Sequence, residues 1–166
     1  MNGDEKSPAM NFLFVDTCNS CRSIMAEAIF NQLARAGWFA MSAGSQPERG
    51  VHLRVISIFG RLDIPTHLLR PKPLAYVSIK PDAVIALSAD PILQKMIQSF
   101  QPAALSHWDV PDPLVATGTH EQLDMAFLKT YRALETRIRG LIDTLSSAID
   151  TNDFCLRSAL EPAPQH

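Results

Sequence analysis

The sequence predicts an α/β fold with three layers, in which helices cover both faces of a four-stranded parallel sheet. Short apolar runs of strand type alternate with amphipathic stretches of helical spacing. This alternation is typical of parallel strands joined by right-handed helical crossovers. The run 82–87 also carries no charge after its first residue, as expected of a strand covered on both faces. In such folds the ligand site lies at the carboxyl ends of the strands.

The first half of the chain provides two strands and two helices. We expect a strand at 11–15, a helix at 23–37, a strand at 38–42 and a helix at about 52–62. Apolar residues recur three and four positions apart in the first helix, which predicts one buried stripe. This stripe contains Met25, Ala28, Ile29, Leu33 and Ala36. In the second helix we expect Val55, Ile56 and Phe59 to face inward.

The second half begins with an irregular, proline-rich segment at 65–73. We then expect a strand at 82–87, a helix at about 91–100, a brief strand near 103–105 and a long amphipathic helix from about 121 to 147. The domain organisation that follows is a mobile lead-in over 1–10, one domain over 11–148 and a loosely ordered tail over 149–166.

Composition excludes several functional classes. A chain of 166 residues with 46% hydrophobic residues is typical of one soluble domain. Fifteen Lys and Arg against 17 Asp and Glu give a net charge of -2, without the basic excess that binding to nucleic acid or a membrane needs. The polar start and the lack of a long apolar run predict a cytoplasmic protein. Three cysteines, an odd number, favour a reducing compartment.

The segment from Asp16 to Ser23 lies where the first strand ends and the first helix begins. Successive backbone N–H groups at such a junction can converge beside the positive end of the helix and bind a tetrahedral anion. Arg22 would add two parallel hydrogen bonds to an oxyanion. The alternative is an ordinary helix N-cap at Ser20 with a surface arginine.

A longer run, Phe12 to Ala28, resembles the signature of arsenate reductases built on the low-molecular-weight tyrosine phosphatase fold. Later landmarks of that family follow in order, and the resemblance covers roughly positions 11 to 145. These landmarks are Ser42 to Pro47, Val51 and His52, Arg70 to Leu74, His107 and Trp108, and Pro111 to Pro113.

The resemblance implies a reaction and a site. In the family a cysteine at the head of the loop attacks phosphorus or arsenic while the loop holds the oxyanion, and Asp112 would protonate the leaving group. The residues expected to bind phosphate, arsenate or a sulfate-like oxyanion are Thr17, Cys18, Asn19, Ser20, Cys21, Arg22 and Ser23. No bound cofactor is implied. The resemblance does imply an external thiol reductant, which would be glutathione with glutaredoxin, mycothiol or thioredoxin. It also implies a thiol-redox partner protein. No metal site is expected, because His52 and His107 lack ligand spacing.

The sequence departs from the family at the head of the loop, where Asp16 stands in place of cysteine. A carboxylate there repels an oxyanion by about 4 kcal/mol at 4 Å with an effective dielectric near 20. One interpretation is that the loop amides and Arg22 hold the carboxylate itself as an internal anion, which would lower its pKa. The other is an unusual Asp nucleophile. The candidate catalytic residues are therefore Asp16, Cys21, Arg22 and Asp112.

Two thiols remain in the loop. Cys21, beside the helix start, is expected to have a lowered pKa, and Cys18 forms a Cys-x-x-Cys pair with it. They are either a displaced nucleophile or redox pair, or two loop residues without chemistry. Ser88 stands where thioredoxin-coupled arsenate reductases have the cysteine of a Val-Cys pair, so the resemblance implies that the relay cysteine of that branch is absent. Cys155 is interpreted as a residue without a role in the chemistry.

Three functions follow from these observations. The first is an arsenate reductase or low-molecular-weight phosphatase relative with impaired or altered catalysis. The second is a non-catalytic oxyanion-binding or regulatory module of the same fold. The third is a thioredoxin-like Cys-x-x-Cys oxidoreductase, against which the ordered downstream landmarks argue.

Overall fold

A computed structural model describes residues 8–151 and 154–160. Strands and helices alternate along the described chain, as the pattern predicts. The strands are β1 (Met10–Asp16), β2 (Trp38–Gly44), β3 (Ala83–Ala86) and β4 (Ala104–His107). The helices are α1 (Arg22–Leu33), α2 (Leu53–Arg61), α3 (Pro91–Gln98), α4 (His120–Asp150) and α5 (Leu156–Leu160), with single 3₁₀ turns η1 (Leu74–Tyr76) and η2 (Pro113–Val115).

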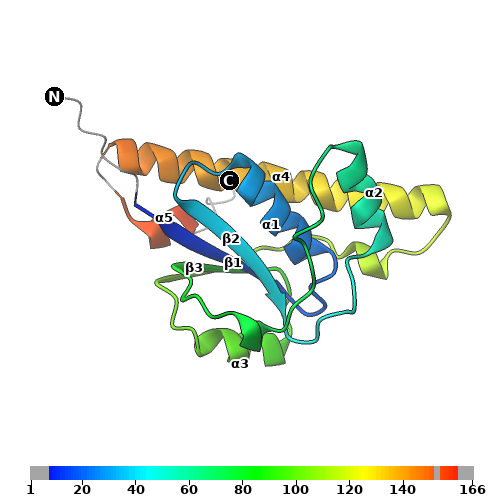
Figure 1. The fold of residues 1–166 in the computed structure, drawn as a ribbon, viewed down its shortest axis with the longest axis horizontal. Helices are drawn as coiled ribbons and strands as arrows, with labels where there is room; N and C mark the ends of the chain where they lie inside the picture. Colours follow the sequence, from blue (N-terminus) through cyan, green and yellow to red (C-terminus); the bar gives the residue numbers. More distant parts are fainter. Residues whose placement is uncertain (1–7, 152–153, 161–166) are drawn as a thin grey trace.

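The four strands form one parallel sheet in the order β2-β1-β3-β4. Figure 1 shows β1 and β2 side by side with their carboxyl ends pointing the same way. In the register, Asp16 at the end of β1 lies opposite Gly44 at the end of β2. The expected site at the carboxyl edge of the sheet is therefore bordered by β1, β2 and the segments that leave them.

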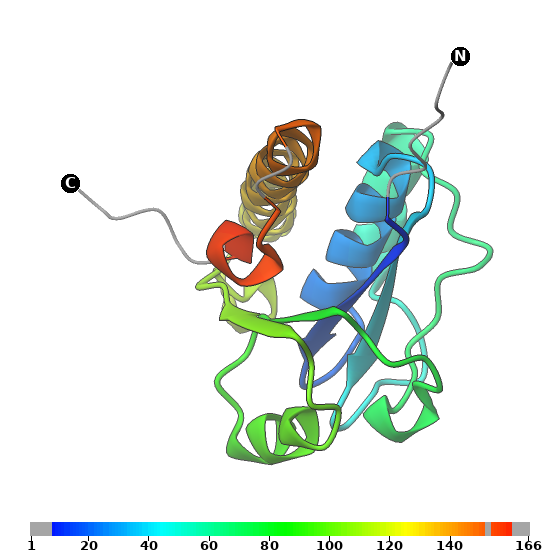
Figure 2. The ribbon, with the colours of Figure 1, turned by 90° about the vertical axis from the view of Figure 1, so that its left-hand side faces the viewer.

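Helices cover both faces of the sheet, which makes three layers (Figure 2). Alternate residues of β1 divide between the two cores: Phe12 and Phe14 pack under α1 and α4, whereas Leu13 and Val15 pack against α3. This division follows from the two-residue period of a strand, and it explains why β1 is almost continuously apolar.

Several predicted boundaries were wrong. The first helix ends at Leu33, because Ala34 adopts an extended conformation, so Ala36 lies outside it. In α2, Ile58 is buried where Ile56 was expected, and Ile56 is 42% exposed. The long helix runs to Asp150, three residues beyond the predicted end.

The tail expected to be loosely ordered contains α5, which packs on β4. Leu160 is buried, and the Ser106 hydroxyl donates to the Leu160 carbonyl at 2.9 Å. Residues 152–153 and 161–166 of that tail, and 1–7 of the lead-in, lie outside the described residues. Among the helices of the described segments, none is both long enough and apolar enough to cross a lipid bilayer.

Candidate oxyanion site at the end of β1

The loop between β1 and α1 is held from outside by its carbonyl groups. Backbone N–H groups of the segment after β2 donate to them: Gln46 to Thr17 at 2.8 Å, Glu48 to Cys18 at 2.8 Å and His52 to Ser20 at 2.9 Å. In a planar trans peptide, a C=O and the next N–H point in opposite directions. The N–H groups of Cys18, Asn19 and Cys21 therefore point to the inside of the loop, and the expected nest forms.

Asn19 fixes the loop from within. Its backbone φ is +46°, in the left-handed region that asparagine tolerates better than most residues. Its fully buried side chain donates to the hydroxyls of Ser23 at 2.8 Å and Ser42 at 2.9 Å, and it accepts from the Lys72 backbone N–H at 2.8 Å. One side chain thus joins α1, β2 and the segment before η1.

Asp16 occupies the base of the nest. Its carboxylate accepts from the Asn19 backbone N–H at 2.5 Å and from the Ser23 backbone N–H at 2.9 Å, and the residue is only 3% exposed. These two contacts agree with the interpretation that the loop amides hold the Asp16 side chain in place of an external anion. The expectation of a lowered pKa was wrong: burial raises the pKa of Asp16, although the two amides and the Ser23 hydroxyl oppose that rise.

Asp16 leaves part of the nest unused. Within the described chain, five loop N–H groups have no acceptor, those of Thr17, Cys18, Ser20, Cys21 and Arg22. The loop therefore retains a rim of amides above a base that is filled by the protein's own carboxyl group.

Arg22 does not reach Asp16 as expected. Its guanidinium pairs instead with the Asp112 carboxylate at 2.8 Å and donates to the Val110 carbonyl at 3.3 Å. Both side chains of the pair are largely buried, at 13% and 29% exposure. The predicted acid and the predicted oxyanion-binding arginine thus lie together at the loop, and they neutralise each other.

The two loop thiols lie in an environment that favours the protonated form. Cys21 is 2% exposed and stands at the N-cap of α1 without a side-chain capping hydrogen bond, so the alternative of an N-cap at Ser20 does not hold. Burial, and then the charges of Asp16 and Asp112, raise the pKa of Cys21 far above its usual range. Burial and Asp16 also raise the pKa of Cys18. The expectation of thiolate character at Cys21 was therefore wrong.

Sequence reasoning missed a buried polar network behind the loop. The Ser42 hydroxyl donates to the Glu27 carboxylate, and Lys72 Nζ lies 3.4 Å from Glu27 Oε2. Glu27 is 8% exposed on an otherwise apolar face of α1. Glu27 lies outside the predicted apolar stripe of the first helix, so the sequence periodicity provided no signal that it is buried.

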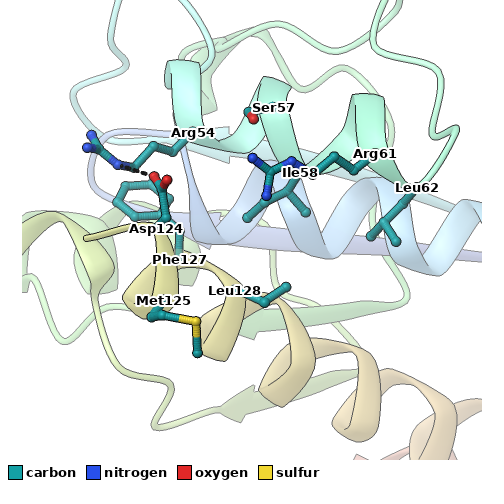
Figure 3. Close-up of a pocket in the computed structure, with 9 residues that line it drawn as sticks. All are labelled: Arg54, Ser57, Ile58, Arg61, Leu62, Asp124, Met125, Phe127 and Leu128. Atoms are coloured by element: carbon teal, nitrogen blue, oxygen red, sulfur yellow. Dashed lines mark hydrogen bonds and ion pairs between the residues drawn. The ribbon is translucent and has the colours of Figure 1, made fainter. Parts of the chain in front are cut away.

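A cavity of ≈ 180 Å³ lies beside the site, between α2 and α4 (Figure 3). Its floor contains Ile58 and Phe127, and Arg54 at its rim pairs with Asp124 at 2.8 Å. His52 links the cavity to the loop, because its backbone N–H donates to the Ser20 carbonyl while its side chain caps α2 and stacks on Phe127. In the described segments, no group of three or more His, Cys, Asp or Glu side chains has the arrangement of a metal site.

The sequence over residues 11–151 matches the family profile described as low molecular weight phosphotyrosine protein phosphatase. This match spans most of the chain, from the first strand to the end of α4. The chain belongs to this phosphatase family. The family resemblance predicted from the sequence is thereby confirmed.

Several solved structures share the fold. YfkJ from Bacillus subtilis is 22% identical, with a TM-score of 0.64 over 86% of this chain and 98% of that one. A low molecular weight protein tyrosine phosphatase from T. tengcongensis is 28% identical, with a TM-score of 0.63 over 82% and 99%. An arsenate reductase in the phosphate binding state is 22% identical, with a TM-score of 0.60 over 78% and 97%. No curated protein sequence matches the chain closely enough to count as a relative.

Proposed function

We propose that this chain is a non-catalytic member of the low-molecular-weight phosphatase family, a binding or regulatory module in which Asp16 replaces the nucleophile. The observation that carries the proposal is the pair of hydrogen bonds from the Asn19 and Ser23 amides to the two oxygens of Asp16. A carboxylate held in this way is positioned as the loop's own ligand. It also cannot supply the electrons that reduction of arsenate requires.

The environment of the remaining groups supports the same proposal. Cys21 is buried and its pKa is raised, so little thiolate would exist at neutral pH to attack a phosphate or arsenate. Arg22 is paired with Asp112, so binding an oxyanion through the guanidinium would require that ion pair to open or to be shared. Activity through a displaced thiol is the weaker alternative for these reasons.

A second candidate function is binding of an oxyanion without turnover. Five amides of the loop have no acceptor within the described residues, and protonation of Asp16 would remove the charge beneath them. Because burial raises the pKa of Asp16, this neutral form persists to a higher pH than for an ordinary aspartate. The module would then hold a tetrahedral oxyanion more tightly as falling pH protonates Asp16.

The experiment that tests the absence of catalysis measures hydrolysis of para-nitrophenyl phosphate and reduction of arsenate with glutathione and glutaredoxin. We expect no turnover by the natural chain, and hydrolysis by Asp16→Cys, which restores a thiol six positions before Arg22. Asp16→Ser is the matched control, since it removes the carboxylate without supplying a thiol. Turnover by the natural chain that survives Asp16→Ala and is lost in Cys21→Ser would overturn the proposal and favour a displaced nucleophile.

A further inference from the structure

A groove of ≈ 590 Å³ is lined by residues of α1, β2 and the irregular segment that follows α2. β2 is an edge strand of the sheet. This volume lies within the range of about 300–1,000 Å³ that is typical of small-molecule sites. The wall is largely apolar and is built by Ala28, Phe39, Met41, Ile64, Leu68 and Leu69. The groove is separate from the loop at Asp16, whose nest residues do not line it.

Two of these apolar side chains are unusually exposed. Leu68 is 74% exposed and Phe39 is 47% exposed, and both line the same groove. Exposed apolar surface costs about 25 cal/mol per Å² relative to burial. An apolar body placed between these two side chains would remove both of them from water.

The charged side chains of the groove favour an anion. Glu27 and Lys72 line it as a pair, with Lys72 Nζ 3.4 Å from Glu27 Oε2, so their charges balance. Arg70 also lines the groove and makes no ion pair within the described part of the chain. One positive charge at the wall therefore remains uncompensated.

We propose that this groove binds a small amphipathic molecule, with an apolar body seated on Phe39 and Leu68 and an anionic head group on Arg70. The site is distinct from the loop between β1 and α1 and does not depend on the function proposed for that loop.

Addition of an extended peptide to the edge of the sheet is opposed by the hydrogen bonds already made there. The N–H groups of Trp38, Ala40 and Gly44 donate to groups of this chain: to Arg35 O at 3.1 Å, to Asn31 Oδ1 at 2.8 Å and to Lys72 O at 3.0 Å. The Asn31 amide also donates to the Ala40 carbonyl at 2.9 Å. Strand addition requires free backbone groups along the edge, and Asn31 blocks its centre.

The probe for this site is 8-anilino-1-naphthalenesulfonate, which combines an aromatic body with a sulfonate. We expect one saturable site in a fluorescence titration of the full chain, with a Kd below about 100 μM, a reasonable affinity for a ligand of that size. Arg70→Glu and Leu68→Asp should each weaken binding about tenfold or more. N-phenyl-1-naphthylamine, which lacks the sulfonate, should bind more weakly and should not respond to Arg70→Glu.

Matched substitutions outside the groove provide the controls. Arg61→Glu makes the same charge change at the cavity between α2 and α4, and Leu53→Asp makes the same polar change at a side chain that is 79% exposed on α2. Both should keep the affinity for the probe within about twofold. Far-ultraviolet circular dichroism of each variant establishes that it is folded.

Three results would overturn the proposal. One is no saturable binding of the probe, and another is an equal loss of affinity in the groove variants and their controls. The third is a concentration-dependent rise in molar mass on light scattering that Leu68→Asp abolishes, because the groove would then hold a second copy of the chain.

Discussion

At the scale of single residues, the loop of this phosphatase homologue is organised around a carboxyl group. Asp16 offers two acceptor oxygens, and each receives one backbone N–H, from Asn19 and from Ser23. These two hydrogen bonds favour the charged form, whereas burial favours the neutral form and has the larger effect, so the pKa of Asp16 is raised. Through these two hydrogen bonds Asp16 also braces the loop.

The raised pKa of Asp16 predicts how stability depends on pH. Above its ordinary pKa of 3.8 the unfolded chain loses the Asp16 proton, while the folded chain keeps it until the raised value is passed. The folded state binds more protons in that window, so the contribution of Asp16 to stability is full below about 3.8 and falls as pH rises.

The measurement is urea unfolding of the natural chain and of Asp16→Asn between about pH 4 and pH 7. The difference in free energy of unfolding, natural minus variant, should decrease with rising pH. A difference that increases over this range would show that the folded protein holds Asp16 as a carboxylate with a lowered pKa.

The side chain of Asn19 is expected to contribute strongly to stability. Asn19→Gly keeps the left-handed backbone accessible but removes three buried hydrogen bonds, so it should cost about 2–4 kcal/mol. Gln101→Gly is the matched control, because Gln101 has a similar φ of +44° and is exposed. Chemical denaturation checks both, and a loss below about 0.5 kcal/mol for Asn19→Gly would contradict the bracing role.

At the scale of elements, the loop depends on close contact with β2. A Cβ atom on Gly44 would lie 2.6 Å from the Thr17 carbonyl oxygen, which is the backbone of the loop itself. The end of β2 can approach the loop only because Gly44 has no side chain. The contact also places the segment from Gln46 to His52 where its N–H groups donate to the carbonyls of the loop.

Two glycine-to-alanine substitutions distinguish the effect of this close contact from the general effect of adding a methyl group. Gly44→Ala should destabilise the protein by about 1–3 kcal/mol, since strand or loop must shift to admit the methyl group. Gly140→Ala, in the middle of α4 with nothing within 4 Å of the added Cβ, should stabilise it by about 0.5–1 kcal/mol through helix propensity. Thermal unfolding measures both, and changes of the same sign would contradict the close-contact explanation.

The elements themselves follow from local patterns, whereas several of their contacts do not. The apolar run of β1 and the periodicity of α4 predict a strand and a helix. The prediction that Ile56 faces inward was wrong. Ile56 and Ile58 are both apolar and lie close together on α2, and only packing against α4 decides which of them is buried. The pairing of Arg22 with Asp112 joins residues 90 positions apart, which no local pattern contains.

At the scale of the whole molecule, the fold and the position of the site were predictable from sequence, and the state of the site was not. Alternating strands and helices, with a loop at the first crossover, were sufficient to place Asp16 through Ser23 at the carboxyl edge of the sheet. Burial decides the protonation of Asp16 and Cys21, and burial arises from the assembly of α1, α4 and the sheet. The thiol reductant and the thiol-redox partner implied by the resemblance stay predictions.

The central claim, that the Asp16 carboxylate fills the base of the loop between β1 and α1, is tested most directly by titrating sulfate into the natural chain and into Asp16→Ser by calorimetry at pH 8. Sulfate is the suitable probe because its own charge does not change near neutral pH. We predict that the variant binds sulfate about a hundredfold or more tightly than the natural chain, because a charge repulsion of several kcal/mol has been removed. Equal affinity of the two proteins for sulfate would contradict the claim.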